Sequence, residues 1–225
     1  MITEENKREM ELWKKDRKNF DLQWPDENVV RYLNKNFKTG DNKVIVDFAC
    51  GSGRNTIVMA KMGFDIYAVD YNMDCLLLTK EKIDKLQYSK IQYIQNERTD
   101  IPLSPESSDC LVAWGALFYV NGKERTELFK EIYRVLKPGG LFLADYRTKE
   151  DSHYGRGREI EKDLFVLNDS VGNLKGINYW FCGESEIREL YANNNFEILN
   201  IEKREMYVDN MAVKNSHWQI WARKL

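Results

Sequence analysis

Two aspartates and two glycines form the group of residues in this sequence that is best suited to holding a polar ligand. Asp47 follows the β-branched run 44–46, and Gly51 and Gly53 come directly after it. Asp70 ends the next apolar run, about 20 residues past the glycines. Glycines let a backbone approach a ligand closely, and a helix N-terminus presents free N–H groups. An acidic side chain at this distance can accept hydrogen bonds from both ribose hydroxyls, so the spacing predicts a nucleotide-binding strand–turn–helix unit.

Residues 47–53, Asp-Phe-Ala-Cys-Gly-Ser-Gly, resemble the first motif of the class I S-adenosylmethionine-dependent methyltransferases. The family motif reads acidic-x-Gly-x-Gly-x-Gly, and Ala49 stands in the place of its first glycine. Residues 131–140, Glu-Ile-Tyr-Arg-Val-Leu-Lys-Pro-Gly-Gly, are similar to the family's segment ahead of the fifth strand. The resemblance covers residues 40–146, and the run 51–56 is similar to the small-molecule and tellurite-type branch.

The resemblance implies a Rossmann-like α/β fold, a mostly parallel seven-stranded sheet with helices on both faces. The implied strand order is 3-2-1-4-5-7-6, with the last strand antiparallel. Periodicity alone supports an α/β sandwich, with strands expected over 44–46, 64–69, 91–95, 109–114, 141–145, 196–202 and 216–224. The chain is then a single domain, which divides into an N-terminal helical lid (1–39), a cofactor-binding core (40–146), a substrate-cap excursion (147–182) and the C-terminal part of the sheet (183–225).

The cofactor implied by the resemblance is S-adenosyl-L-methionine (SAM). Asp70 is expected on the ribose, and Asp100, in the turn after the third strand, is expected to accept a hydrogen bond from the adenine amine. The full set of expected cofactor-binding residues is Asp47, Ala49, Gly51, Gly53, Asp70, Tyr71, Thr99, Asp100, Ile101 and Trp114.

The acceptor side of the reaction points to the residues after the fourth and fifth strands. Methyl transfer from a sulfonium needs alignment and exclusion of water, and a hydroxyl acceptor also benefits from a general base. The sequence has two histidines, His153 and His217, and these are the candidate bases. The alternative for His153 is a solvated loop histidine, and the alternative for His217 is a strand-edge histidine with a local hydrogen bond. The expected substrate-binding residues are Tyr119, Tyr146, Arg147, Tyr154 and Trp180.

Arg147 has two interpretations. It could clamp a carboxylate or phosphate of the substrate, or it could pair with a nearby acid such as Asp151. Residues 161–167 and 175–181 are expected to form a hairpin within the same excursion.

Composition narrows the classes of partner. The net charge of −2 gives no general attraction to nucleic acids or anionic membranes. No apolar run reaches the roughly 20 residues of a membrane helix. The four cysteines lack metal-site spacing, and they fit reduced thiols in a cytoplasmic protein without a bound metal.

These observations predict an enzyme that moves a methyl group to an oxygen or nitrogen atom of a small molecule, as a monomer or homodimer. Two alternatives stay open at this point: a methyltransferase that acts on a macromolecule, and a cofactor-binding module without turnover. A nicotinamide dehydrogenase is disfavoured because Thr56 stands where its fingerprint has a third glycine.

Overall fold

The computed structural model describes residues 21–225, without the side chains of residues 171–173. The helices are α2 (Glu27–Asn36), α3 (Arg54–Met62), α4 (Met73–Asp84), α5 (Gly122–Val135), the 3-10 helix η1 (Asp169–Leu174) and α6 (Glu184–Asn193). The strands are β1 (Val44–Phe48), β2 (Asp65–Asp70), β3 (Ile91–Gln95), β4 (Ser108–Ala113), β5 (Leu136–Thr148), β6 (Gly157–Glu161), β7 (Leu164–Leu167), β8 (Asn178–Cys182), β9 (Phe196–Val208) and β10 (Val213–Lys224).

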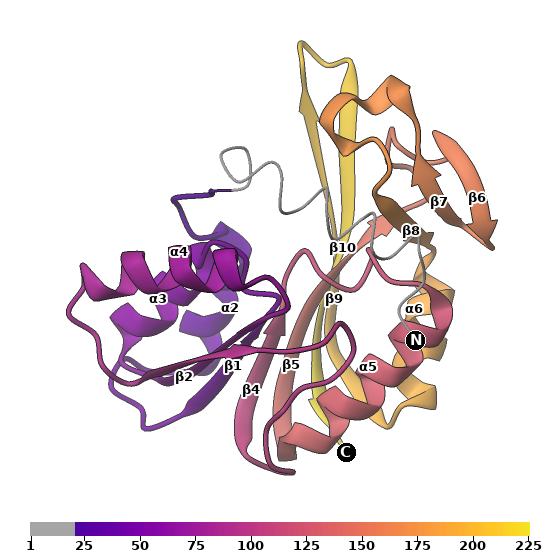
Figure 1. The fold of residues 1–225 in the computed structure, drawn as a ribbon. Coiled ribbons are helices and arrows are strands. Elements are labelled where there is room, and N and C mark those ends of the chain that lie inside the picture. The colour runs from indigo at the N-terminus through magenta and orange to yellow at the C-terminus, as the bar shows by residue number, and fades with distance from the viewer. Residues whose placement is uncertain (1–20) are drawn as a thin grey trace.

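The main sheet confirms the predicted strand order (Figure 1). Strands β3, β2, β1, β4 and β5 lie side by side and run parallel. Strand β10 lies antiparallel between β5 and β9, so the seven core strands lie in the order β3-β2-β1-β4-β5-β10-β9. Numbered one to seven along the chain, these strands have the predicted order 3-2-1-4-5-7-6, with the last one reversed. The carboxyl ends of β1, β2, β4 and β5 therefore meet at one edge, where ligands bind in open α/β sheets.

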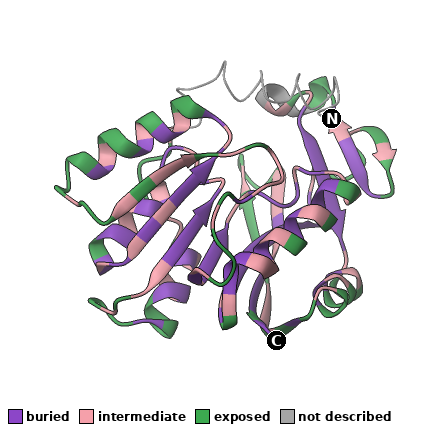
Figure 2. Cartoon of the chain, turned by 60° about the horizontal axis from the view of Figure 1, so that its bottom comes forward, coloured by how far each residue is buried: buried purple, intermediate pink, exposed green. Residues whose placement is uncertain are grey.

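Two apolar layers hold helices on the two faces of the sheet, and the buried sides of the helices face it (Figure 2). On one face, Ile45, Leu143 and Trp221 pack with α2 and α3. On the other face, Phe142 and Ile220 belong to the cluster that α5 and α6 cover. Because parallel strands are buried on both faces, their apolar runs are nearly continuous, as in residues 44–46. None of the helices in residues 21–225 is long and apolar enough to cross a membrane.

Strand β5 is longer than the sequence predicts, and its far end carries the excursion. The prediction placed the strand at 141–145, whereas β5 spans Leu136–Thr148 and takes in the Lys-Pro-Gly-Gly segment through an irregularity in its pairing with β4. Pairing with β4 stops at Ala144, and β8 then pairs with Arg147 and Thr148. The predicted hairpin is present as the antiparallel pair β7 and β8, to which β6 adds a third strand.

Candidate cofactor and acceptor site

The turn between β1 and α3 has the backbone that its small residues predict. Ala49, Gly51 and Gly53 have φ angles of 54°, 56° and 80°. This left-handed region costs a non-glycine residue about 1–2 kcal/mol, so Ala49 adopts a conformation that glycine would adopt more easily. A Cβ atom at Gly53 would lie 2.7 Å from the side chain of Thr79, so only glycine fits there. The turn therefore brings the start of α3 close to the end of β1.

Asp47 lies under this turn as a buried carboxylate. The hydroxyl of Thr56 donates to Asp47 Oδ2 at 2.5 Å, which gives a structural reason for threonine at this position. Burial, only partly offset by that hydrogen bond, raises the pKa of Asp47 to about 7. The carboxylate therefore favours a ligand that brings positive charge or further hydrogen-bond donors.

Asp70 closes the turn from the side of β2. Its Oδ2 accepts a hydrogen bond from the backbone N–H of Gly51 at 2.9 Å, and its Oδ1 accepts one from the N–H of Asn72 at 2.8 Å. Burial raises its pKa to about 6 despite these two bonds. Each carboxylate oxygen can accept more than one hydrogen bond, so both retain capacity toward a ligand.

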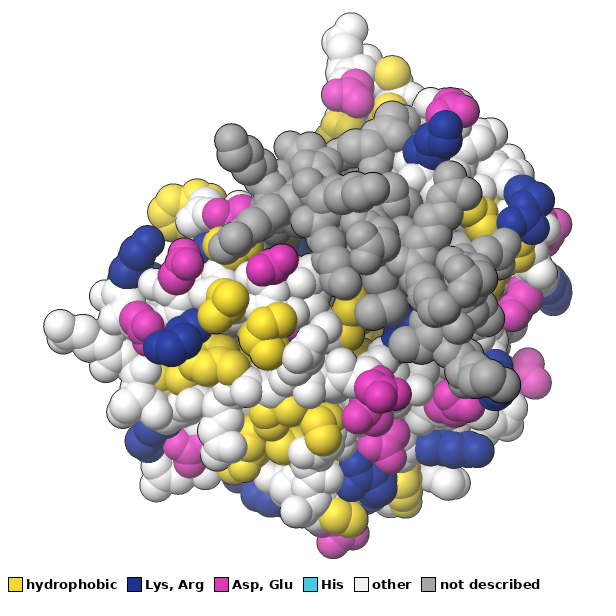
Figure 3. Space-filling model, in the orientation of Figure 1, with side chains coloured by type: hydrophobic (Ala, Val, Ile, Leu, Met, Phe, Trp, Pro, Cys, Tyr) yellow, Lys and Arg dark blue, Asp and Glu magenta, His cyan; other side chains and the backbone are white. Residues whose placement is uncertain are grey.

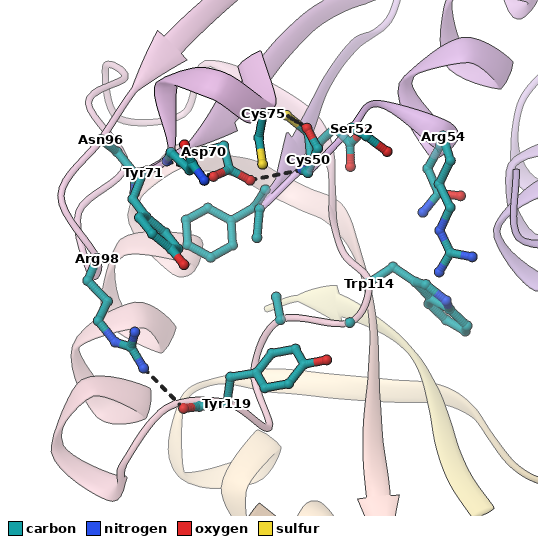
Figure 4. Close-up of a pocket in the computed structure, with 18 of the residues that line it drawn as sticks. Cys50, Ser52, Arg54, Asp70, Tyr71, Cys75, Asn96, Arg98, Trp114 and Tyr119 are labelled. Carbon is teal, nitrogen blue, oxygen red and sulfur yellow. Dashed lines mark hydrogen bonds between the residues drawn. The ribbon is translucent and has the colours of Figure 1, made fainter. Parts of the chain in front are cut away.

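A cavity of about 440 Å³ opens at this edge of the sheet (Figure 4). Asp70 and Cys50 lie on one side of it, with Arg98 and Tyr119 across from them and Trp114 on a third side. Of the residues predicted to bind cofactor, the ones that line the cavity are Asp47, Ala49, Gly51, Asp70, Tyr71 and Trp114.

The turn after β3 contributes to the cavity through residues that the sequence analysis did not select. Asn96 and Arg98 line it, whereas Thr99, Asp100 and Ile101 do not. Asn96 Nδ2 donates to the backbone carbonyl oxygen of Asp100 at 2.7 Å, which links the two ends of the turn. Asp100 Oδ1 is buried and has no hydrogen-bond partner within the described chain, and Ile101 is fully buried in the core. No local pattern separates Asn96 and Arg98 from their neighbours, because alternation along the turn would select Asp100 as well.

Tyr119 lines the cavity on the acceptor side. Burial raises the pKa of its phenol well above the usual range, so the phenol stays protonated. Its ring lies 5.4 Å from that of Tyr179, which hydrogen-bonds to Arg147 Nη2 at 3.4 Å. Tyr119 is the predicted substrate-binding residue that the structure places in the cavity wall.

Other predicted substrate residues do not line this cavity. Tyr146 is fully buried in the layer under α5 and α6, where its hydroxyl lies 3.1 Å from that of Tyr191. Trp180 belongs to the same layer, and the guanidinium of Arg125 lies 3.5 Å from its ring centroid.

The remaining two are bonded to acids. Tyr154 donates to Asp163 at 2.8 Å, and Arg147 pairs with Asp151 at 2.8 Å. The second of the two interpretations of Arg147 is therefore the one that the structure supports.

Each histidine is bonded to an aspartate through Nδ1. His153 lies 2.7 Å from Asp151 Oδ1, and His217 lies 2.9 Å from Asp145 Oδ2. Neither histidine lines the cavity. Asp145 also accepts a hydrogen bond at 2.6 Å from the N–H of Gly115, and Gly115 lines the cavity. The pair at His217 is thus joined directly to the cavity wall.

The segment before α2 reaches the cavity as well. Leu22 lines it, and its carbonyl oxygen accepts hydrogen bonds from Ser52 Oγ at 3.2 Å and Lys82 Nζ at 2.7 Å. The first part of the predicted lid, residues 1–20, lies outside the described residues. No cluster of three or more potential metal-binding side chains is found in residues 21–225.

Comparison with known proteins decides the family. Residues 45–140 match a family model described as a methyltransferase domain. A demethylmenaquinone methyltransferase of Lactobacillus johnsonii is 32% identical over 179 residues, which are 74% of this chain and 72% of that protein. The chain belongs to the class I S-adenosylmethionine-dependent methyltransferases. Its cofactor is S-adenosyl-L-methionine.

Two further proteins, one matched by sequence and one by structure, are similar to this chain. The tRNA N(3)-cytidine methyltransferase METTL2 of Danio rerio is 22% identical over 190 residues, which are 80% of this chain and 52% of that protein. A SAM-dependent methyltransferase from Methanosarcina mazei shares the fold, with a TM-score of 0.74, 22% identity, and coverage of 86% of this chain and 97% of that one. The chain spans about half the length of the first curated relatives it matches. The tellurite-type branch stays a prediction.

The cavity fits the charge and hydrogen-bonding groups of SAM. The cofactor carries a sulfonium, an ammonium and two ribose hydroxyls, and the turn offers it two buried carboxylates, Asp47 and Asp70. Within the described chain, these two carboxylates accept hydrogen bonds from uncharged donors, namely two backbone N–H groups and a hydroxyl. Positive charge and hydroxyl donors from a ligand would therefore stabilise their ionised forms.

Proposed function

We propose that this protein transfers a methyl group from SAM to an oxygen or nitrogen atom of a small molecule. The observation that carries the proposal is the cavity itself, which joins the carboxylates of the cofactor turn to the wall after β4. When bound, SAM supplies an electrophilic methyl group. The protein's own residues then have to align an acceptor with it and keep water away.

The residues after β4 are suited to that second task. Tyr119, Val120 and Leu128 give the cavity a partly aromatic and partly aliphatic wall, and the Tyr119 phenol provides one polar group. Small-molecule sites combine an apolar wall with a few placed polar groups in this way. We further propose that residues 1–39 act as a lid and residues 147–182 as a cap over the acceptor. Leu22, held by Ser52 and Lys82 beside the cavity, supports the lid.

Charge favours a small acceptor over a nucleic acid. On the face drawn in Figure 3, the described acidic and basic side chains are interspersed and do not form a field of one sign. The whole chain has a net charge of −2, whereas binding to a phosphate backbone depends on clustered positive charge. The similarity to a tRNA methyltransferase makes an RNA acceptor the second candidate.

The test has two stages. Calorimetric titration with S-adenosylhomocysteine measures cofactor binding without any acceptor, and we expect a single saturable site. Transfer of label from methyl-labelled SAM is then measured with separate panels of phenols, amines, carboxylic acids and unmodified transfer RNA. Label that moves to RNA and to none of the small molecules would overturn the proposed acceptor class. Absence of binding in the first stage would overturn the proposed function as a whole.

A further inference from the structure

We propose that His217 is the general base of this methyltransferase and that Asp145 positions it, so that the methyl acceptor is a hydroxyl group. The inference rests on the proposed function and adds to it the acceptor chemistry and the choice between two histidines.

The two oxygens of Asp145 have separate roles. The side chain of Asp145 is 4% exposed, its Oδ1 accepts a hydrogen bond from the backbone N–H of Gly115, and its Oδ2 lies 2.9 Å from His217 Nδ1. An ionised carboxylate can only accept hydrogen bonds, so Nδ1 of His217 must carry the proton. Nε2 then has a free lone pair, and no hydrogen-bond partner of Nε2 is found within residues 21–225.

The position of the ring suits proton transfer next to the cavity. Gly115, whose N–H fixes Asp145, lines the cavity wall. Phe118, which is buried between the lining residues Ala116 and Tyr119, packs edge-on to the imidazole with ring centroids 5.9 Å apart. The side chain of His217 is 22% exposed, which leaves a route for the proton to solvent. Asp145 and Phe118 therefore hold the imidazole in place, and part of the ring stays exposed to solvent.

The charged neighbours of His217 balance one another. Arg147 on β5 and Arg204 on β9 lie directly opposite His217 in the antiparallel register, so the three residues share one face of the sheet. Each arginine lies beside an acid that also has another partner: Asp151 lies 2.8 Å from Arg147, and Glu202, which binds Arg31, lies 3.3 Å from Arg204. Asp145 is then left to stabilise the imidazolium that forms.

The second histidine lacks this arrangement. The carboxylate of Asp151 is shared by His153, by Arg147 and by the backbone N–H of Ser216. Its negative charge is already compensated by the guanidinium, so it supports a positive imidazole less than Asp145 does. His153 reaches the cavity wall through ring packing on Tyr179, and not through the carboxylate that holds it.

The step balances without a further reactant. As the acceptor oxygen bonds to the methyl carbon, the carbon–sulfur bond breaks with its electron pair passing to sulfur, and the hydroxyl proton passes to Nε2 of His217. The products are a methyl ether, S-adenosylhomocysteine and an imidazolium paired with the Asp145 carboxylate, and this imidazolium returns its proton to water. General base catalysis of this kind contributes about 10²–10⁴-fold to rate.

Nitrogen NMR on the full chain, saturated with S-adenosylhomocysteine, tests the inference without a known acceptor. The chain has two histidines, so His153→Gln leaves the signals of His217 alone. At pH 8 we expect a protonated Nδ1 and a bare Nε2. Phenol, added as the probe, should shift the Nε2 resonance by donating a hydrogen bond, whereas anisole, which lacks the hydroxyl, should not.

Asp145→Asn tests the positioning role. The Gly115 N–H holds the amide oxygen, so the amide nitrogen faces His217 Nδ1 and donates to it. We expect the proton of His217 to move to Nε2 and the response to phenol to be lost. A proton on Nε2 in the unaltered complex, or a phenol shift no larger than that of anisole, would overturn the inference while cofactor binding stands. These two readings do not depend on the folding of the variant.

Discussion

Two groups of buried aspartates in this methyltransferase have opposite electrostatics. Asp47 and Asp70, at the cofactor turn, accept hydrogen bonds from uncharged donors, and burial raises their pKa values to about 7 and about 6. Asp151, beside the excursion, is also buried, but the hydrogen bond from His153 and the charge of Arg147 outweigh that burial and hold its pKa well below the usual range. The negative charge of the first group is left for a ligand to compensate, whereas the negative charge of Asp151 is already compensated by the protein.

The largest expected effect is on stability and comes from the second group. Asp151→Ala leaves the buried guanidinium of Arg147 without its acid, and breaking a buried ion pair in this way costs about 3–5 kcal/mol. Denaturant unfolding of the unliganded protein measures the loss. Asp163→Ala is the matched control, because its partner Lys149 has a more exposed side chain (35%, against 11% for Arg147) and should tolerate the loss better. Equal losses in the two variants would contradict the distinction.

The next effect is on cofactor affinity and comes from the first group. Asp70→Ala removes the predicted acceptor for the ribose hydroxyls, and the loss of charge-assisted hydrogen bonds costs roughly 1.5–3 kcal/mol, or about tenfold or more in affinity. Calorimetric titration with S-adenosylhomocysteine checks the value, and circular dichroism checks that the variant is folded. An unchanged dissociation constant in a folded variant would remove Asp70 from the ribose.

A smaller effect is expected from pH. Ligand binding favours the ionised carboxylates, so affinity for S-adenosylhomocysteine should rise severalfold between pH 5.5 and 8, as groups with pKa values of about 6 and about 7 lose their protons. The stability of the unliganded protein should change in the opposite sense. A carboxyl whose pKa is raised by folding binds more protons in the folded state, so its contribution is present at low pH and is lost as pH rises through the folded pKa.

The control for the pH effect is a variant that cannot titrate at one position. Asp70→Asn should bind more weakly and should show a flatter pH dependence over the same range. A pH dependence identical to that of the unaltered protein would assign the titration to other groups.

The smallest effect is expected at the turn after β3. Asp100→Asn keeps one oxygen acceptor and should bind S-adenosylhomocysteine nearly as well as the unaltered protein, while Asp100→Ala should bind it more weakly. Asn96→Ala removes the hydrogen bond to the Asp100 carbonyl oxygen and serves as the comparison, since Asn96 itself lines the cavity. If both changes at Asp100 are silent and Asn96→Ala is not, the adenine contact belongs to Asn96.

The cofactor side was largely predictable from the sequence because its geometry is local. A strand, a turn of small residues and a helix lie within a few residues of one another, and a glycine that must avoid Thr79 leaves a direct mark on the sequence. The strand order was confirmed because it follows from the family, whose motifs are dense in residues 40–146. The extent of β5 was missed because Pro and Gly usually end an element, whereas here they occupy an irregular strand beginning.

The acceptor side was less predictable because its geometry depends on pairing between distant strands. Asp145 was not selected, although its bond to His217 joins β5 to β10. Tyr146 and Arg147 were grouped together as substrate-binding residues, but successive side chains of a strand point to opposite faces. Tyr146 therefore lies in the core under α5, while Arg147 lies on the face that carries Asp145.

The pairing of Thr148 with Cys182 has a consequence for engineering and for divergence within the family. The chain leaves the sheet at one residue and returns at its immediate neighbour in the adjacent strand, so the segment between them can be exchanged as a cassette that keeps Asp151, the acid bonded to Arg147 and Ser216 outside it. Its length and sequence can change while the anchoring strands keep their register, and the cofactor turn, formed by β1 and β2, lies outside it. Transplanting this cassette from a related enzyme should therefore alter which acceptors are methylated and leave the dissociation constant of S-adenosylhomocysteine in place.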